Sequence, residues 1–246
     1  MRSFAFAVLC AFGLQALGAD RDRVLFVCAH PDDLVPSLGT CLLMKDRFEI
    51  HVCDVTHGEF GLGRKGFEDG TTKATRMREE EAVCAAIGAK LHWLDEIDGQ
   101  AYATQETCRR LADLIVTLRP RAVFGHWPID THPDHVMSAA VLQRAAIRAG
   151  FKGEYYFFEE GRQAKGFLPV FYVDITRVRA EKNRLIRLYA CQNEKDALVT
   201  EESEPVDRAR GNQMRFRPTE MTDAEVFSPY PGTGQGSGII FTELGN

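Results

Sequence analysis

The chain has 246 residues, of which 45% are hydrophobic and 26% charged, and its formal net charge at pH 7 is -5. This composition is ordinary for a globular protein and excludes the disordered and fibrous classes. A net negative charge gives no general attraction to nucleic acid or to an anionic membrane, because binding a polyanion requires a clustered basic surface. A small molecule or a neutral polymer is therefore the favoured partner.

The first 19 residues have the pattern of a secretory signal peptide. Arg2 precedes an apolar stretch over residues 4–17, and Gly18 and Ala19 come before the first dense charges. The apolar stretch is shorter than the roughly 20 residues of a membrane span. We expect cleavage after Ala19 and export to the periplasm or the cell exterior, with a buried N-terminal helix or an uncleaved anchor as the alternative. Residues 20–246 are predicted to form a single domain with no stable membrane span.

Cysteine usage indicates core packing rather than cross-linking. Cys28 and Cys53 lie in apolar runs typical of strands, and Cys84 lies among the apolar positions of a predicted helix. The spacing contains no CxxC pair of the kind that a structural zinc site favours. We expect at most one disulfide.

Apolar runs and helical patterns alternate after the signal peptide. A continuous apolar run predicts a strand over residues 24–28, followed by a helix over residues 34–46 and a second strand over residues 48–55. A helix over residues 72–87 then precedes a third strand over residues 91–94. Short strands that are apolar throughout are typical of a sheet buried on both faces.

The same alternation continues to residue 189. The remaining predicted elements are, in order, helix, strand, helix, strand, strand and helix: residues 104–118, 121–125, 133–149, 155–158, 171–173 and 177–189. The stretch over residues 193–246 is polar and rich in Pro and Gly, and we expect it to be irregular. Strands alternating with helices predict a Rossmann-like α/β fold, with a mostly parallel sheet and helices on both faces.

Two loops rich in histidine and aspartate follow the first and fourth predicted strands. The first loop reads AHPDD over residues 29–33, and the second reads HWPIDTHPDH over residues 126–135. Ligands of such sheets bind beyond the carboxyl ends of the strands, where the strand order reverses, and the first and fourth strands are neighbours there. We therefore expect the loops to face one another. Neither loop has the GxGxxG spacing of a dinucleotide site, so no nucleotide cofactor is predicted.

The side chains of these loops suit a catalytic zinc site. Such a site takes three histidine or carboxylate ligands and leaves a fourth position open for water. Asp32 and Asp33 can divide two roles, one carboxylate on the metal and the other directed at the water. The alternative is that Asp32 or Asp33 caps the helix beginning near Leu34, and that Thr131 or Asp134 caps the next helix. The position of both loops at sheet ends favours the functional interpretation.

The two loops resemble the signatures of the LmbE-like family, which includes the N-acetylglucosaminylphosphatidylinositol de-N-acetylases. The matching motifs are HPDD over residues 30–33 and PxDxHPDH over residues 128–135. Shorter likenesses follow in a consistent order: TxGE at residues 56–59, RxxE at Arg76 and Glu79, DIT at residues 174–176, Lys182, YxxQ at residues 189–192 and AExF at residues 224–227. The likeness covers residues 24–230, nearly all of the predicted mature chain.

The resemblance implies a Rossmann-like fold and a specific chemistry. It implies a zinc ion on three ligands: His30, Asp33 and His135. Asp32 would act as the general base, and a protonated His132 would lie beside the substrate carbonyl, where it would stabilise the developing negative charge. Asp134 would orient a histidine. The implied reaction is hydrolysis of an N-acetyl group from an amino sugar, presented as a small molecule or as an oligosaccharide.

Other residues bear on substrate binding and on departures from the family. Glu59 and Arg76 are the candidates for holding substrate hydroxyls or anionic groups, and the alternative for Arg76 is an ion pair with a glutamate of its own helix, Glu79 or Glu80. Leu34 stands where the family usually has Glu, which could alter metal affinity.

The remaining histidines are expected to contribute less directly. His57 stands where the family commonly has Asn, which leaves the substrate contacts of that loop open. His51 and His92 alternate with apolar residues in strand-like runs and are expected to be core or surface residues. His126 lies closer to the two loops and is a candidate for an outer contact of the site.

Two rival functions stay open from the sequence. The first is an exported carbohydrate-binding protein that keeps the fold without turnover, which Leu34 favours weakly. The second is a zinc hydrolase acting on another amide or on an ester, because the ligands activate water and say little about the leaving group. The identity of the metal and the possibility of a homo-oligomer are also open.

Overall fold

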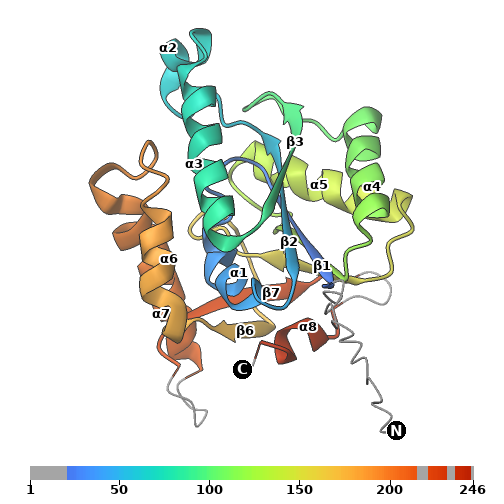
Figure 1. The fold of residues 1–246 in the computed structure, drawn as a ribbon, viewed down its shortest axis with the longest axis vertical. Coiled ribbons are helices and arrows are strands. Elements are labelled where there is room, and N and C mark those ends of the chain that lie inside the picture. The colour runs from blue at the N-terminus through green and yellow to red at the C-terminus, as the bar shows by residue number, and fades with distance from the viewer. Residues whose placement is uncertain (1–20, 215–220, 232–235, 245–246) are drawn as a thin grey trace, which may run out of the picture.

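A seven-stranded sheet forms the centre of the protein, with the strand order β3-β2-β1-β4-β5-β7-β6 (Figure 1). We describe it from a computed structural model that covers residues 21–214, 221–231 and 236–244. The predicted signal peptide over residues 1–19 lies outside the described residues. None of the helices in the described ranges is long and apolar enough to cross a membrane.

Five strands of the sheet are parallel, and they lie close to the predicted positions. They are β1 (Arg23–Cys28), β2 (Glu49–Thr56), β3 (Lys90–Glu96), β4 (Ala122–His126) and β5 (Glu154–Phe158). Strand β1 pairs with β2 on one side and with β4 on the other, so the strand order reverses at β1. The predicted Rossmann-like class and the predicted neighbourhood of the first and fourth strands are therefore confirmed.

Helices cover both faces of the sheet (Figure 1). One face buries Phe26 and Phe124 against α1 (Leu38–Met44), α3 (Thr71–Ile87) and α6 (Arg179–Ile186). The other face packs on α4 (Gln105–Leu118) and α5 (Pro133–Arg148). Shorter helical elements are α2 and three turns of 3-10 helix: Gly63–Glu68, Val35–Ser37, Thr176–Val178 and Glu194–Asp196. Both faces are thus buried, as continuous apolar strands require.

Five of the cysteines in the described ranges belong to these cores. Each of the six cysteines in the described ranges is unpaired, and five of them are buried. Burial raises the pKa of the Cys28 and Cys41 thiols well above the ordinary value, which keeps them in the apolar, protonated form.

Where the structure describes it, the C-terminal segment is not irregular, and that part of the prediction is wrong. It forms a π-helical turn at Leu198–Ser203, α7 (Glu204–Gln213), β7 (Ala224–Pro229) and α8 (Ile239–Thr242). Strand β7 lies between β5 and β6 (Phe171–Asp174) and pairs antiparallel with both. The strand was missed because its second residue, Glu225, looks solvent-exposed in sequence but is 2% exposed in the structure.

A buried ion network explains why Glu225 can lie inside the sheet. Lys182 Nζ of α6 is 2.6 Å from Asp207 Oδ2 of α7 and 2.8 Å from Glu225 Oε1. Glu225 also accepts hydrogen bonds from the backbone nitrogens of Gly39 and Thr40, each at 2.7 Å, and therefore caps α1. The helix that Asp32 or Asp33 could have capped is thus capped by a residue of β7. The network joins α1, α6, α7 and β7.

Replacing Lys182 with Met is expected to lower the free energy of unfolding by about 3 to 5 kcal/mol, because Glu225 would stay buried without its cation and Asp207 would keep only Arg179. Urea denaturation followed by circular dichroism measures the change. The matched control is Lys65→Met, whose side chain is 93% exposed and whose loss should cost less than about 0.5 kcal/mol. A loss at Lys182 no larger than the control's would show that the network contributes no stability.

Candidate metal centre and active site

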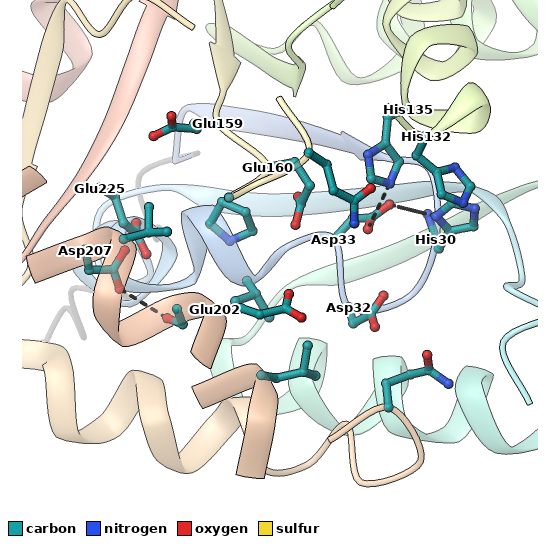
Figure 2. A pocket seen from close by; sticks show the side chains of 18 of the residues that line it. His30, Asp32, Asp33, His132, His135, Glu159, Glu160, Glu202, Asp207 and Glu225 are labelled. Atoms are coloured by element: carbon teal, nitrogen blue, oxygen red, sulfur yellow. Dashed lines mark hydrogen bonds and ion pairs between the residues drawn. The ribbon is translucent and has the colours of Figure 1, made fainter. Parts of the chain in front are cut away.

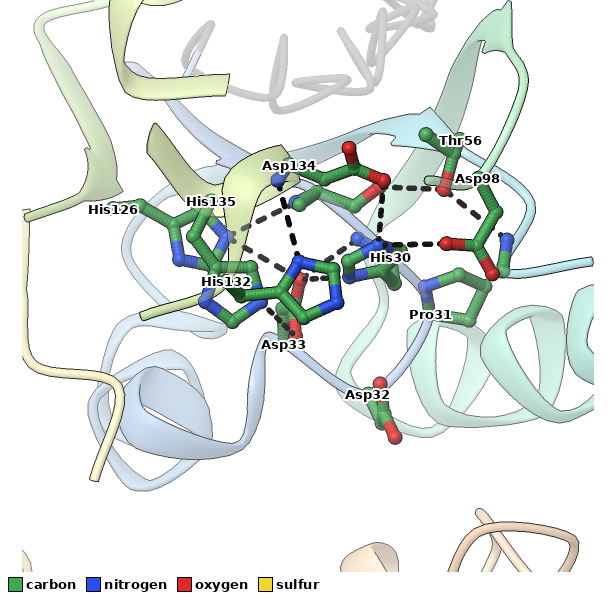
Figure 3. Close-up of polar contacts among 12 residues, drawn as sticks. His30, Pro31, Asp32, Asp33, Thr56, Asp98, His126, His132, Asp134 and His135 are labelled. Carbon is green, nitrogen blue, oxygen red and sulfur yellow. Dashed lines mark hydrogen bonds and ion pairs between the residues drawn. The ribbon is translucent and has the colours of Figure 1, made fainter. Parts of the chain in front are cut away.

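The two predicted loops meet at the carboxyl ends of β1 and β4 (Figure 3). The last residue of β4 is His126, and its Nε2 accepts a hydrogen bond from the backbone nitrogen of Ala29 at 3.0 Å. Burial lowers the pKa of His126 to about 4, so its ring is neutral and able to accept this bond. His126 therefore joins the two loops rather than facing the substrate pocket.

Asp33 lies at the centre of the cluster. Its Oδ2 is 3.1 Å from His30 Nδ1, and its Oδ1 is 3.5 Å from His135 Nε2. The same Oδ2 accepts a hydrogen bond from the backbone nitrogen of His30 at 2.7 Å, which fixes the carboxylate within its own turn. Burial raises the pKa of Asp33, but the charges of His135 and His30 outweigh it and hold the pKa well below the ordinary value. Asp33 is therefore an ionised carboxylate between two histidines.

The spacing of Asp33 from each of the two histidines fits a zinc ion. Two ligands of a tetrahedral zinc, with bonds near 2.05 Å, lie about 3.3 Å apart. The distances from Asp33 to the nitrogens of His30 and His135 fall on either side of this value. The ligand atoms of His30, His135 and His132 also lie within 4.8 Å of one another. Two imidazole nitrogens and a carboxylate oxygen form a donor set that zinc prefers.

The outer nitrogens of the two histidines support the same interpretation. His30 Nε2 lies 3.2 Å from Asp134 Oδ2, and His135 Nδ1 lies 3.3 Å from Asp130 Oδ1. A carboxylate on the outer nitrogen fixes the tautomer and orientation of a metal-binding histidine. Burial lowers the pKa of His135, but Asp33 and Asp130 raise it to about 10. The carboxylates around His30 and His135 thus give the cluster a surplus of negative charge, which a divalent cation would balance.

Asp32 lies beside the cluster and lines the pocket (Figures 2 and 3). Its Oδ1 accepts a hydrogen bond from Arg76 Nη2 at 2.6 Å. Burial raises the pKa of Asp32 to about 7, with Arg76 opposing the rise and Asp33 adding to it. A carboxylate with a pKa near neutrality can accept a proton and release it again.

His132 takes the capping role that the sequence suggested for Thr131 or Asp134. It is the N-cap of α5, and its Nδ1 accepts a hydrogen bond from the backbone nitrogen of Asp134 at 3.3 Å. Burial and the nearby His30 and His135 lower the pKa of His132. Because Nδ1 accepts, the neutral ring carries its single proton on Nε2. His132 can therefore donate a hydrogen bond in its neutral form.

Of the two predicted substrate residues, Arg76 belongs to the pocket lining and Glu59 does not. Arg76 lines the pocket but is 5% exposed, and it pairs with Asp32 rather than with Glu79 or Glu80. Glu59 is outside the pocket lining, since its carboxylate accepts from the backbone nitrogen of Asp98 at 3.1 Å and faces His57. Leu34, which replaces the family Glu, lies in the apolar core.

One acid of the cluster, Asp98, was not among the predicted site residues. Asp98 Oδ1 lies 3.2 Å from His30 Nε2, and His30, Asp98 and Asp134 form a further group with ligand atoms within 4.8 Å of one another. Asp98 follows β3, which ends at Glu96. The rule that selected the loops after the first and fourth strands could therefore have found it.

A pocket of about 330 Å³ opens over the cluster and extends toward α6, α7 and β7 (Figure 2). Beyond the cluster, its apolar lining consists of Val35, Pro36, Phe60, Leu198, Val206, Ala224 and Val226. Acidic residues also line it, including Glu159, Glu160 and Glu202. The pocket is therefore large enough for a substrate that extends beyond the cluster.

Each lysine and arginine among the described lining residues is already paired. Arg76 pairs with Asp32, and Lys182 pairs with Asp207 and Glu225. The third cation, Arg210, pairs with Glu159 through two nitrogens. Two acids lack such a partner: the buried Glu160 Oε2 has no hydrogen bond, and Glu202 has no ion pair within the described residues. Apart from the histidines of the cluster, the lining thus presents paired ions, neutral groups and unpaired acids to a substrate.

The sheet and the cluster define a Rossmann-like α/β protein whose histidine and aspartate site lies where the strand order reverses. The chain belongs to the PIG-L (LmbE-like) family, whose sequence model, described as GlcNAc-PI de-N-acetylase, matches residues 25–146. The family match ends within α5, so it contains both loops of the cluster.

Relatives within this family catalyse two kinds of reaction. The chain is 30% identical over 201 residues to 4-oxalmesaconate hydratase of Pseudomonas putida, covering 72% of this chain and 76% of the relative. It is 29% identical over 166 residues to 1D-myo-inositol 2-acetamido-2-deoxy-alpha-D-glucopyranoside deacetylase of Thermomonospora curvata, covering 52% of this chain and 53% of the relative. Family membership therefore leaves the substrate open.

A solved structure supports the fold over nearly the whole described chain. The 4-carboxy-2-hydroxymuconate hydratase of Pseudomonas putida superposes with a TM-score of 0.75 at 25% sequence identity. The superposition covers 87% of this chain and 99% of the hydratase. The seven-stranded, mostly parallel α/β fold thus matches that of a solved neighbour.

Proposed function

We propose that this protein is a zinc-dependent hydrolase that removes the N-acetyl group from an N-acetylated amino sugar. The observation that carries the proposal is the charge of the pocket, whose described lysine and arginine side chains are all neutralised by acids of the same chain. A neutral sugar needs hydrogen-bond acceptors and no free cation. The family description and the deacetylase among the relatives support the same reaction.

A second candidate is hydration of a carbon–carbon double bond, which the 30% identical hydratase favours. The substrate named for the structurally similar hydratase carries a carboxy group. Binding a carboxylate draws on unpaired arginine or lysine side chains, because these give charge-assisted and often bidentate hydrogen bonds. The paired cations of this pocket make that candidate weaker.

The proposed chemistry follows from the placement of the residues. Zinc held by His30, Asp33 and His135 would acidify water at the site. Asp32 would accept the proton of that water on Oδ2, because Oδ1 is held by Arg76. The proton would then pass from Asp32 to the leaving amine. Both proton transfers use the Asp32 carboxylate, whose pKa lies near neutrality.

His132 and Asp134 would act on the substrate carbonyl and on a ligand, respectively. His132 would donate its Nε2 proton in a hydrogen bond to the carbonyl oxygen as negative charge develops there. Asp134 would hold His30 with Nδ1 toward Asp33, since its own Oδ2 lies at the other ring nitrogen. Asp134 also accepts from the backbone nitrogen of Gly99 at 2.6 Å, which fixes its carboxylate.

The test is a substrate panel with the purified mature protein and one equivalent of zinc. The panel contains N-acetylglucosamine, chitooligosaccharides, cell-wall fragments, lipid-linked sugars and a carboxymuconate. We expect acetate from at least one sugar and no loss of the ultraviolet absorbance of the carboxymuconate.

The other outcomes each identify a rival function. Hydration of the carboxymuconate without acetate release from any sugar would favour the hydratase candidate over the deacetylase. Hydrolysis confined to an amide or ester that lacks the sugar would favour the broader hydrolase. Sugar binding with zinc present and no turnover would favour the carbohydrate-binding protein.

We also propose that the protein acts outside the cytoplasm. This rests on the sequence of residues 1–19 alone, where a basic start, a short apolar stretch and small residues form the pattern of a cleaved signal peptide. An exported deacetylase would meet extracellular or cell-wall sugars.

A further inference from the structure

Asp32 adopts a backbone conformation that needs support. Its φ is +91°, in the left-handed region that non-glycine residues rarely occupy. Such a conformation persists where surrounding contacts determine it, and it is common at functional sites. The contacts of Asp32 should therefore include groups that hold its backbone as well as its side chain.

Helix α3 supplies two such groups, one turn apart. Glu80 Oε2 accepts a hydrogen bond from the backbone nitrogen of Asp32 at 3.3 Å, and Arg76 Nη2 donates to Asp32 Oδ1 at 2.6 Å. Arg76 also donates to the carbonyl oxygen of Pro31. Residues four apart lie on the same face of a helix, so Arg76 and Glu80 reach the loop together.

Both side chains are held firmly in place. Glu80 is 1% exposed, and its Oε2 also accepts from the hydroxyl of Tyr189 at 2.8 Å. The guanidinium of Arg76 packs against Gly58 and Gly61, where an added Cβ would come within 2.6 and 2.5 Å of it. The face of α3 that carries these two residues is thus a rigid support for the loop.

The loop itself offers no such support. Leu34 directly follows the two aspartates, and its side chain lies in the apolar core. The loop therefore has no third acid of its own. Glu80 brings a buried carboxylate to the backbone of Asp32 from another element.

We propose that Glu80 is a positioning residue for Asp32. By accepting the Asp32 N–H, it holds the left-handed backbone in which the Asp32 carboxylate meets Arg76 and lines the pocket. The inference rests on the proposed function in one respect, that Asp32 is the proton acceptor. Glu80 itself is not among the residues that line the pocket.

The test compares two variants of Glu80. Glu80→Leu removes the acceptor, and we expect kcat for acetate release to fall by roughly 10- to 100-fold through misplacement of Asp32, with KM within about twofold and zinc content unchanged. Glu80→Gln keeps an oxygen acceptor and should restore kcat to within about threefold of the wild type. The matched control is Glu81→Leu, which changes an exposed glutamate of the same helix and should leave kcat unaltered.

A second readout does not depend on activity. In the zinc-free protein, the Asp32 amide proton should move upfield in Glu80→Leu, because it loses its hydrogen bond, and should stay in place in Glu81→Leu. If Glu80→Leu does not fold, Tyr189→Phe removes the other donor to Glu80 Oε2, and we expect a severalfold lower kcat together with a shifted Asp32 amide.

The outcomes separate this inference from the proposed function. Wild-type kcat with an unmoved Asp32 amide, in Glu80→Leu or in Tyr189→Phe, would overturn the positioning role. Equal losses in Glu80→Leu and Glu80→Gln would overturn it as well, because an acceptor alone would then not suffice. A wild-type protein that releases no acetate would refute the proposed function, while the amide shift would still decide the role of Glu80.

Discussion

Replacing Asp33 with Asn is expected to remove bound zinc and to lower acetate release by roughly a thousandfold or more. Asp33 carries the only negative charge among the three proposed ligands, and its oxygens lie between His30 and His135. A neutral amide has one oxygen and an NH₂ group in place of the two carboxylate oxygens, so it is a poorer metal ligand. Without the metal, water at the site keeps its high pKa and is a weak nucleophile.

Metal analysis after dialysis and an acetate assay measure the two losses in the Asp33→Asn variant. The matched control is Asp46→Asn, which changes an exposed aspartate after α1 and should keep both zinc and activity. Full zinc content and full activity in Asp33→Asn would show that Asp33 is not a metal ligand. The group of His30, Asp98 and Asp134 would then be the better candidate.

Replacing Asp32 with Asn is expected to lower kcat by about a hundredfold or more while zinc stays bound. Asparagine keeps an oxygen for Arg76 but cannot accept a proton. In the wild type, kcat should fall as the pH drops through the pKa of Asp32, which burial raises to about 7, because the protonated carboxyl cannot act as the base. The variant should lack this acid limb.

A pH profile of kcat, measured with zinc content at each pH, checks the role of Asp32. Zinc content separates loss of the base from loss of the metal, since acid also protonates histidine ligands. A variant with wild-type kcat, or with the same acid limb, would assign the proton transfer to another group. Glu160 would be the first alternative, because it lines the pocket and has an unpaired buried oxygen.

Most strands of the sheet could be predicted from the sequence. Strand β7 is the exception, and its cause is a buried charge. The two central parallel strands, β1 and β4, are largely apolar along their length, which is visible in a short window of sequence. Strand β7 was missed because Glu225 interrupts its apolar pattern. That carboxylate is buried only because Lys182 lies against it, and the two residues come from different elements.

The candidate site shows the same division. The two short loops predict His30, Asp33 and His135 as ligands, and in the structure Asp33 lies 3.1 Å from His30 Nδ1 and 3.5 Å from His135 Nε2. Arg76 was assigned to the substrate or to its own helix, whereas its partner is Asp32. Glu59 was assigned to the substrate as well, and it faces His57 and Asp98 instead. The short motifs placed residues near the site without showing their partners.

The sequence by itself determined the class of the fold and the location of the site, because both depend on contiguous stretches of chain. Apolar strands specify a sheet buried on both faces, and the loops that follow neighbouring strands must meet at one edge. Only the tertiary structure decided which cations are neutralised and what supports Asp32. Ion pairs and hydrogen bonds depend on distances in space, and Lys182, Glu225 and Glu80 reach their partners from elements that the strand order and helix packing bring together.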